Sequence, residues 1–443
     1  MRPDLPATPR GLPATVTSSA GARQSTLREN NLALVARTVH AATTPMSRAD
    51  VAAATSMTRA TASRLVDELL GAAILDESGR PDSPRRGRPM TPLVPGARIA
   101  ALGLQVDVGI LAARVINLRG ETLAERVETG TFAGSDPAAV LARLGRAARA
   151  VLDDLPSGVR LAGAGLALPG IVDQSSGLLL HAPNLGWTHV RPAELLADLA
   201  LAPDFALAPS LAPAFALVPA LAVAPLPLAV GNEADLAAVT VAQLAPGQPS
   251  DLSDFLYLSG GIGIGGAAVR GGEVIAGRHG WAGEIGHVCV DPNGPPCGCG
   301  STGCLERYAG SHALATAAGL DRTATAEHLA ELVDAGEPRA VEAVNAAAWA
   351  LGVALASTVN ILDVSTVVLG GHLGRIARLL QPTLGDTLRR RVLAARWSAP
   401  ETRVYPQFPA PAATGAGYQR LAAVIADPAR WISAHGSTHA PGP

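Results

Sequence analysis

All four cysteines of this 443-residue chain, Cys289, Cys297, Cys299 and Cys304, fall within a stretch of sixteen residues. A secreted disulfide-rich protein would spread its cysteines, whereas a cluster beside a histidine is typical of a metal site in a reducing cytoplasm. One imidazole and three thiolates, from His287, Cys297, Cys299 and Cys304, form the donor set of a closed tetrahedral zinc site. We therefore expect a cytoplasmic protein with a structural Zn2+ that organises loop 287–304. Cys289 is expected to be a small buried side chain, although it could compete as a ligand.

Charge is divided unevenly along the chain. Residues 1–98 carry 13 Arg against 8 acidic residues, and the remainder carries 22 Arg against 29. A basic segment followed by an acidic body is typical of a nucleic-acid-binding module attached to a domain of another kind. Residues 1–22 contain no apolar signal-peptide core, so we expect a disordered arm there.

Helix signals predict a winged helix-turn-helix domain at residues 23–93. Capping boxes at Thr26 and Ser47 predict helices that run to about positions 40 and 54, and Thr58 is expected to cap a third helix that ends before Gly71. In that third helix Ala62, Leu65, Val66 and Leu69 form one apolar stripe, which leaves the opposite face polar. Residues 74–77 and 90–94 predict two strands that flank an arginine-rich wing.

The polar face and the wing suit double-stranded DNA. Short polar groups and guanidinium forks can hydrogen-bond base edges and phosphates, and arginine favours a narrow minor groove. A three-helix bundle with a solvated face and a basic linker remain the alternatives. The candidate DNA-binding residues are Ser47, Arg48, Thr58, Arg59, Thr61, Ser63, Arg64, Arg85, Arg86 and Arg88.

Beyond Ile99, strand-like and helix-like segments alternate, which predicts an α/β body. Strands are expected near 101–104, 112–118 and 161–167, and a helix at 137–152. The stretch 205–230 has no charge and is long enough to span a bilayer, but five prolines interrupt it. We therefore expect an Ala/Pro/Leu-rich insertion at about 203–224 and no membrane partner.

A dispersed polar set in the body predicts a second site. Its members are Asn232, Glu233, Glu284, His287 and Glu306. If the zinc loop draws them together, their carboxylates and imidazole would suit the hydroxyls of a polyol, although a buried glutamate can also be a plain salt-bridge partner. His287 is left open between zinc and sugar, and its two nitrogens could serve both.

These motifs closely resemble those of the ROK family (repressors, open reading frames, kinases). The resemblance lies in GWAGEIGH at 280–287, the cysteine motif that ends at Glu306, and segments 182–187 and 370–372, and it covers position 23 to about 427. It implies an α/β, two-lobed, actin-like sugar-kinase (ribonuclease H-like) fold behind the winged helix-turn-helix domain. Lobe 1 would span 97–230 and lobe 2 would span 231–427 with a C-terminal return to lobe 1, followed by a flexible tail at 428–443.

The resemblance also implies a ligand and an assembly. A sugar would contact Asn184, Asn232, Glu233, Glu284, His287 and Glu306, and zinc would be held by His287, Cys297, Cys299 and Cys304. The chain would form a homo-oligomer, either a dimer or a tetramer.

Three departures from the kinase motifs separate the two functions of the family. Kinases carry Asp-x-Gly-Gly-Thr where this chain has Gln105 to Gly109, with Asp107 in the phosphate loop. Gly260 replaces a threonine of the second phosphate loop, and Glu233, one methylene longer, replaces the catalytic Asp. We therefore predict a sugar-responsive DNA-binding repressor of carbohydrate genes that neither binds ATP nor phosphorylates sugar. The alternatives are a glucokinase-like, ATP-dependent sugar kinase with a fused DNA-binding domain, and a scaffold that binds neither ligand.

Overall fold

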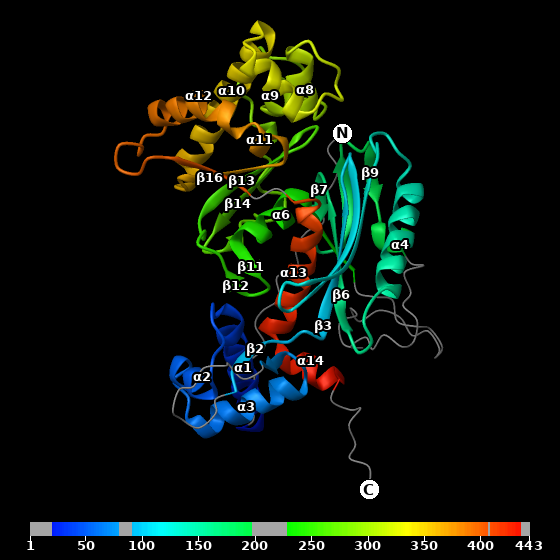
Figure 1. The fold of residues 1–443 in the computed structure, drawn as a ribbon, viewed down its shortest axis with the longest axis vertical. Helices are drawn as coiled ribbons and strands as arrows, with labels where there is room; N and C mark the ends of the chain where they lie inside the picture. The colour runs from blue at the N-terminus through cyan, green and yellow to red at the C-terminus, as the bar shows by residue number, and fades with distance from the viewer. Residues whose placement is uncertain (1–19, 79–90, 197–227, 406–407, 436–443) are drawn as a thin grey trace, which may run out of the picture.

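The computed structural model describes residues 20–78, 91–196, 228–405 and 408–435. At its N-terminal end three helices and a two-stranded ribbon form a head that packs on the rest of the chain (Figure 1). These elements are α1 (Ala20–Ala41), α2 (Arg48–Ala54), α3 (Arg59–Gly71), β1 (Leu75–Glu77) and β2 (Leu93–Pro95). The apolar stripe predicted for α3 is buried, and β1 pairs antiparallel with β2.

Two of the three helices in the head begin at the N-cap residue predicted from the sequence. Ser47 forms a capping box with Asp50, and the Thr58 hydroxyl accepts a hydrogen bond from the Thr61 amide. The third prediction is wrong, because α1 begins at Ala20 and leaves Thr26 inside the helix. The upstream residues Ala, Arg and Gln are good helix formers and extend the helix past this signal. The arginines predicted for the wing, Arg85, Arg86 and Arg88, lie outside the described residues.

Lobe 1 is built on a five-stranded mixed sheet with the order β10-β6-β3-β4-β5. These strands are β3 (Ile99–Val106), β4 (Ile110–Asn117), β5 (Thr122–Thr129), β6 (Arg160–Leu168) and β10 (Leu228–Asn232). Helix α4 (Pro137–Asp153) covers the outer face, where its apolar side chains join those of β3 and β4 in one core. A small sheet of β7 (Ile171–Asp173), β8 (Leu178–Ala182) and β9 (Trp187–Val190) extends this lobe.

Lobe 2 repeats the arrangement with the order β15-β14-β13-β16-β17. The strands are β13 (Phe255–Gly260), β14 (Ile264–Arg270), β15 (Glu273–Val274), β16 (Thr366–Gly370) and β17 (Glu401–Val404). Helices α10 (Pro338–Leu362) and α12 (Ala377–Arg391) pack on its outer face. By length and hydropathy α10 could cross a membrane, but 56% of its most apolar window is buried inside the protein.

Two helices lie between the lobes. The helices α6 (Glu233–Ala242) and α13 (Pro411–Ala426) pack against each other and contact both sheets. The α/β, two-lobed, actin-like architecture predicted from the sequence is therefore confirmed. Gly415 makes the α6–α13 contact possible, because a Cβ atom there would overlap the Leu236 carbonyl oxygen of α6.

The head and the body share one hydrophobic core. Leu421 and Ile425 of α13 lie in the same buried cluster as Leu32 and Val35 of α1. Polar contacts add to this core, since Arg119 of the body donates to Asp76 of β1 at 2.8 Å. Figure 1 shows α13 running from between the lobes down to the head.

The C-terminal segment corrects one prediction. Residues 428–443 were expected to form a flexible tail, but α14 (Pro428–His435) packs against α1, α3 and α13. Trp431 is 4% exposed and lies 5.8 Å from the Arg160 guanidinium, which itself donates to the Ala72 carbonyl oxygen of the head at 2.7 Å. This helix therefore belongs to the junction between head and body.

Candidate functional site

Two hairpin tips and the start of α6 enclose a cleft between the lobes. The β3–β4 tip contributes Asp107 and Val108, and the β13–β14 tip contributes 260–266. Antiparallel hairpins place their turns beyond the ends of both sheets, so these two turns face each other across the cleft. All six predicted sugar-binding residues line this cleft, namely Asn184, Asn232, Glu233, Glu284, His287 and Glu306.

Asn232 anchors the start of α6 in the cleft. Its Oδ1 accepts hydrogen bonds from the Ala234 and Asp235 amides at 2.8 and 3.2 Å, which makes it the N-cap of the helix. Its Nδ2 donates to the Gly170 carbonyl oxygen at 3.0 Å. The Asn232 side chain is thus used to fix the helix start, and it positions the adjacent Glu233 at the cleft wall.

The opposite wall depends on close packing at Gly263. A Cβ atom at this position would overlap Glu306 Oε2 and come within 2.6 Å of Asn184 Nδ2. Glycine therefore lets the β13–β14 tip press directly against the amide of Asn184 and the carboxylate of Glu306. Glu306 is the first residue of α7 (Glu306–Ala309), two positions after the last cysteine.

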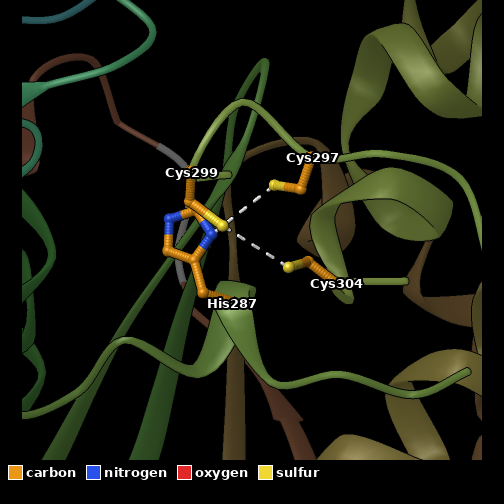
Figure 2. Close-up of side chains that lie close together, drawn as sticks. All are labelled: His287, Cys297, Cys299 and Cys304. Atoms are coloured by element: carbon orange, nitrogen blue, oxygen red, sulfur yellow. Dashed lines mark hydrogen bonds between the residues drawn. The ribbon is translucent and has the colours of Figure 1, made fainter. Parts of the chain in front are cut away.

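The three predicted thiol ligands and His287 converge on one point (Figure 2). Their potential ligand atoms all lie within 4.8 Å of one another. Cys297 and Cys304 are buried and Cys299 is exposed. His287 ends the short 3-10 helix η3 (Ile285–His287), which presents its ring to the cysteine loop.

This donor set fits zinc. Three thiolates and one imidazole at mutual distances of a few ångströms match a closed tetrahedral structural site, which would hold the loop and supply no catalytic water. Cys289 lies outside the quartet and is exposed, so its expected burial is wrong. Its backbone nevertheless forms an antiparallel bridge with that of the buried Cys304.

His287 faces both the cysteine loop and the cleft. Its Nδ1 lies 3.8 Å from Cys297 Sγ, and its Nε2 lies 3.9 Å from Glu284 Oε2. The ring therefore offers one nitrogen to the cysteine cluster and the other to the carboxylates of the cleft. This arrangement would allow His287 to bind zinc through one nitrogen and sugar through the other, which the sequence left open.

The cleft is rich in carboxyl groups whose pKa values are shifted upward. Burial raises the pKa of Asp107, and burial together with the charge of Asp107 raises that of Glu233 well above its usual range. Burial, reinforced by Glu306, raises the pKa of Glu284. Since His287 is the only basic side chain among the described lining residues of this cleft, the shared negative charge is not neutralised by arginine.

A second cavity adjoins the cleft at the carboxyl pair Asp107 and Glu233. Its walls include Tyr257, Tyr405 and Phe408, together with His372 and Arg375. The Arg375 guanidinium is paired with Glu327 at 3.2 Å. At Gly260 a Cβ atom would lie 2.8 Å from His372 Nδ1, so this position leaves little room for a larger residue.

Most of the candidate DNA-binding residues that the structure describes already make hydrogen bonds or ion pairs within the head. Ser47 and Thr58 act as helix caps, and Arg48 pairs with Asp67 and Glu77 at 2.6 and 3.2 Å. Arg64 pairs with Glu68 at 2.7 Å, and Thr61 contacts the Thr58 hydroxyl. Ser63 is half-buried on α3. Among the described residues, no ion pair or side-chain hydrogen bond involves Arg59, which is exposed at the start of α3.

Sequence reasoning missed two polar residues near the cleft. Asp235 is 6% exposed, and burial together with Glu284 raises its pKa to about 7. Gln105 is 2% exposed and bridges Glu233 to α13. The only available signal for Asp235 was its position three residues after the cap Asn232, which places it in the first turn of the same helix.

Comparison with known proteins identifies the family. A model described as the ROK family matches residues 219–418. An N-acetylmannosamine kinase of Escherichia fergusonii is 31% identical over 278 residues, which cover 61% of this chain and 83% of the relative. The chain belongs to the ROK family.

Other ROK proteins match more of the chain. A xylose repressor of Caldicellulosiruptor bescii is 26% identical over 375 residues, 80% of this chain and 86% of the relative. A solved ROK family transcriptional regulator, a homologue of the E. coli MLC protein, superposes with a TM-score of 0.70 over 92% of this chain and 99% of its own, at 20% identity. The ROK hexokinase of Thermus thermophilus covers 72% of this chain and 97% of its own, with a TM-score of 0.55 at 28% identity.

Proposed function

We propose that this ROK protein is a sugar-responsive DNA-binding transcriptional repressor without kinase activity. The observation that carries the proposal is the joint presence of a head with an exposed α3 face and a cleft lined by all six candidate sugar residues. The relative named xylose repressor matches 80% of this chain, which supports the same combination. The repressor would act in the cytoplasm as a homodimer or tetramer with a structural zinc ion.

The acidic lining of the cleft is the basis for proposing that phosphoryl transfer has been lost, because carboxyl groups do not favour the binding of a triphosphate. Asp107 and Glu233 both line the cleft as half-buried residues, and burial raises the pKa of each carboxyl group. Phosphate binding normally uses backbone amides and cations, whereas the Val108 amide at this tip donates to Asp107 itself at 2.5 Å. The competing function, a sugar kinase, is supported by the kinase relatives and predicts ADP formation with a sugar.

The proposed operator contact is made by α3. In a dimer, two such helices would enter successive major grooves about 34 Å apart on a pseudo-palindromic site. Arg59 is the arginine best placed for a base contact, because it is exposed at the helix start and has no partner within the described residues. Arg48 and Arg64 would first have to give up surface ion pairs, each worth less than about 1 kcal/mol.

Arg59→Ala is expected to weaken operator binding by about 5–150-fold, or ~1–3 kcal/mol, while leaving random-sequence DNA nearly unaffected. The measurement is fluorescence anisotropy with DNA from upstream of the gene itself and with a scrambled duplex. Arg143→Ala is the matched control, because it removes the same charge from α4 in the body. Equal losses on the two duplexes would show that Arg59 contacts phosphate only, and no binding of the wild-type chain at low salt would refute the proposed function.

A further inference from the structure

Gln105 connects the cleft to the helix that reaches the DNA-binding head. It sits near the end of β3, and its side chain is buried. Its Nε2 donates to Glu233 Oε1 at 3.4 Å, and its Oε1 accepts from the Ala413 amide at 3.1 Å. One amide group therefore joins a carboxyl group of the cleft to the first turn of α13.

The Ala413 amide is shared between two acceptors. It also donates to the Ala410 carbonyl oxygen at 3.2 Å, and Ala410 has a left-handed backbone with φ 53°. The first turn of a helix has amides without intrahelical acceptors four residues back, so an external acceptor such as Gln105 helps to define where the turn sits. A change at Gln105 therefore acts directly on the position of this helix end.

Helix α13 can carry such a change to the head. It has 16 residues and is about 24 Å long. Its later turns place Leu421, Val424 and Ile425 in the buried cluster that contains Leu32 and Val35 of α1. Because packed cores shift between discrete arrangements rather than deform smoothly, a displacement of the helix would move its contacts in the head.

We infer that Gln105 is a positioning residue that transmits sugar occupancy at Glu233 to α13 and hence to the DNA-binding head. The inference rests on the proposed function. A sugar hydroxyl that donates to Glu233 would compete with the Gln105 amide for the same carboxylate oxygen. Gln105 would then turn or shift, and its acceptor for the Ala413 amide would move with it.

Gln105→Met tests this role, because methionine has a similar volume but makes neither hydrogen bond. The full chain is titrated with D-xylose, D-glucose and N-acetyl-D-mannosamine by calorimetry, and with upstream DNA by anisotropy with and without each sugar. We expect sugar and operator each to bind within about threefold of the wild type, while the change in operator affinity caused by sugar falls from ~5–150-fold to less than about twofold.

Arg114→Met is the matched control. Arg114 also holds the start of α13, through the Pro409 carbonyl oxygen at 3.1 Å and the Thr414 hydroxyl at 2.6 Å, but within the described part of the chain it makes no hydrogen bond or ion pair with the cleft carboxyl groups. We expect this variant to keep the sugar response. If it loses the response as fully as Gln105→Met, general anchoring of α13 explains the effect and the relay is refuted.

Gln105→Leu provides a second variant should the methionine substitution prevent folding. Leucine is also apolar and makes neither hydrogen bond, so this variant too should lose the sugar response. A response retained in a folded Gln105 variant overturns the relay alone. If none of the three sugars changes the operator affinity of the wild-type chain, the proposed function and the relay are both overturned.

Discussion

A Cys304→Ser variant is expected to lose about one zinc ion per chain and to bind sugar at least ~100-fold more weakly than the wild type. Cys304 is fully buried, and its thiol is one of four groups that meet within 4.8 Å. The loop it closes carries His287 at one end and is followed two positions later by Glu306, and both residues lie in the cleft wall. Without its metal, a structural zinc loop loses the free energy that orders it, so both side chains would lose their positions.

Metal analysis and calorimetry check this result together. Cys289→Ser is the matched control, because it makes the same chemical change at the one cysteine outside the quartet, and the residue is exposed. It should keep its zinc and its sugar affinity. Unchanged zinc content in Cys304→Ser, or equal loss in Cys289→Ser, would contradict the assignment of the quartet.

A phosphorylated sugar is expected to bind at least about 100-fold more weakly than the same sugar without its phosphate. The described cleft lining contains Asp107, Glu233, Glu284 and Glu306 but no arginine. Two like charges about 6 Å apart at an effective dielectric constant of ~20 repel by about 3 kcal/mol, which corresponds to roughly 100-fold in Kd. Protonation of a carboxyl group with a raised pKa would remove the repulsion but would still supply no cation to balance a buried phosphate.

Calorimetry with glucose against glucose 6-phosphate, and with N-acetylmannosamine against its 6-phosphate, measures this difference. Asp107→Asn is the informative variant, since it removes one negative charge at nearly constant side-chain shape. It should reduce the difference in affinity between the free sugar and the sugar phosphate. Glucuronate serves as a second anion of different chemistry and should also bind poorly. A sugar phosphate that binds as tightly as the free sugar would contradict this account of the cleft.

The parts of the fold that the sequence predicted are those governed by local signals. Apolar periodicity located α3 through Leu65 and Leu69, and the cysteine spacing located the cluster of Figure 2. Among the polar cleft residues, Asn184 was found only through the family motif, since it lies more than one hundred positions before Glu306. Their proximity depends on Gly263, whose role appears only when both lobes are in place.

The remaining features depend on partners that are distant in sequence. The burial of Trp431 requires α1 and α3 as well as Arg160, so nothing in residues 428–443 alone distinguishes a docked helix from a tail. Helix caps and DNA contacts use the same residue types, which explains why the sequence predicted both a capping box and a DNA contact for Ser47, of which the structure shows the capping box. Gln105 was noted only as the first residue of the altered phosphate-loop motif, because its two hydrogen bonds join residues that are 128 and 308 positions away.

The central claim is that sugar in the interlobe cleft alters DNA binding by the head and is not phosphorylated. It is tested most directly by titrating the full chain with its upstream DNA in the presence of ATP and each sugar, while a coupled assay records ADP. We predict a change of about 5–150-fold in operator affinity with at least one unphosphorylated sugar and no sugar-dependent ADP. Sustained ADP formation that Glu233→Gln abolishes, with operator affinity unchanged by any sugar, would contradict the claim.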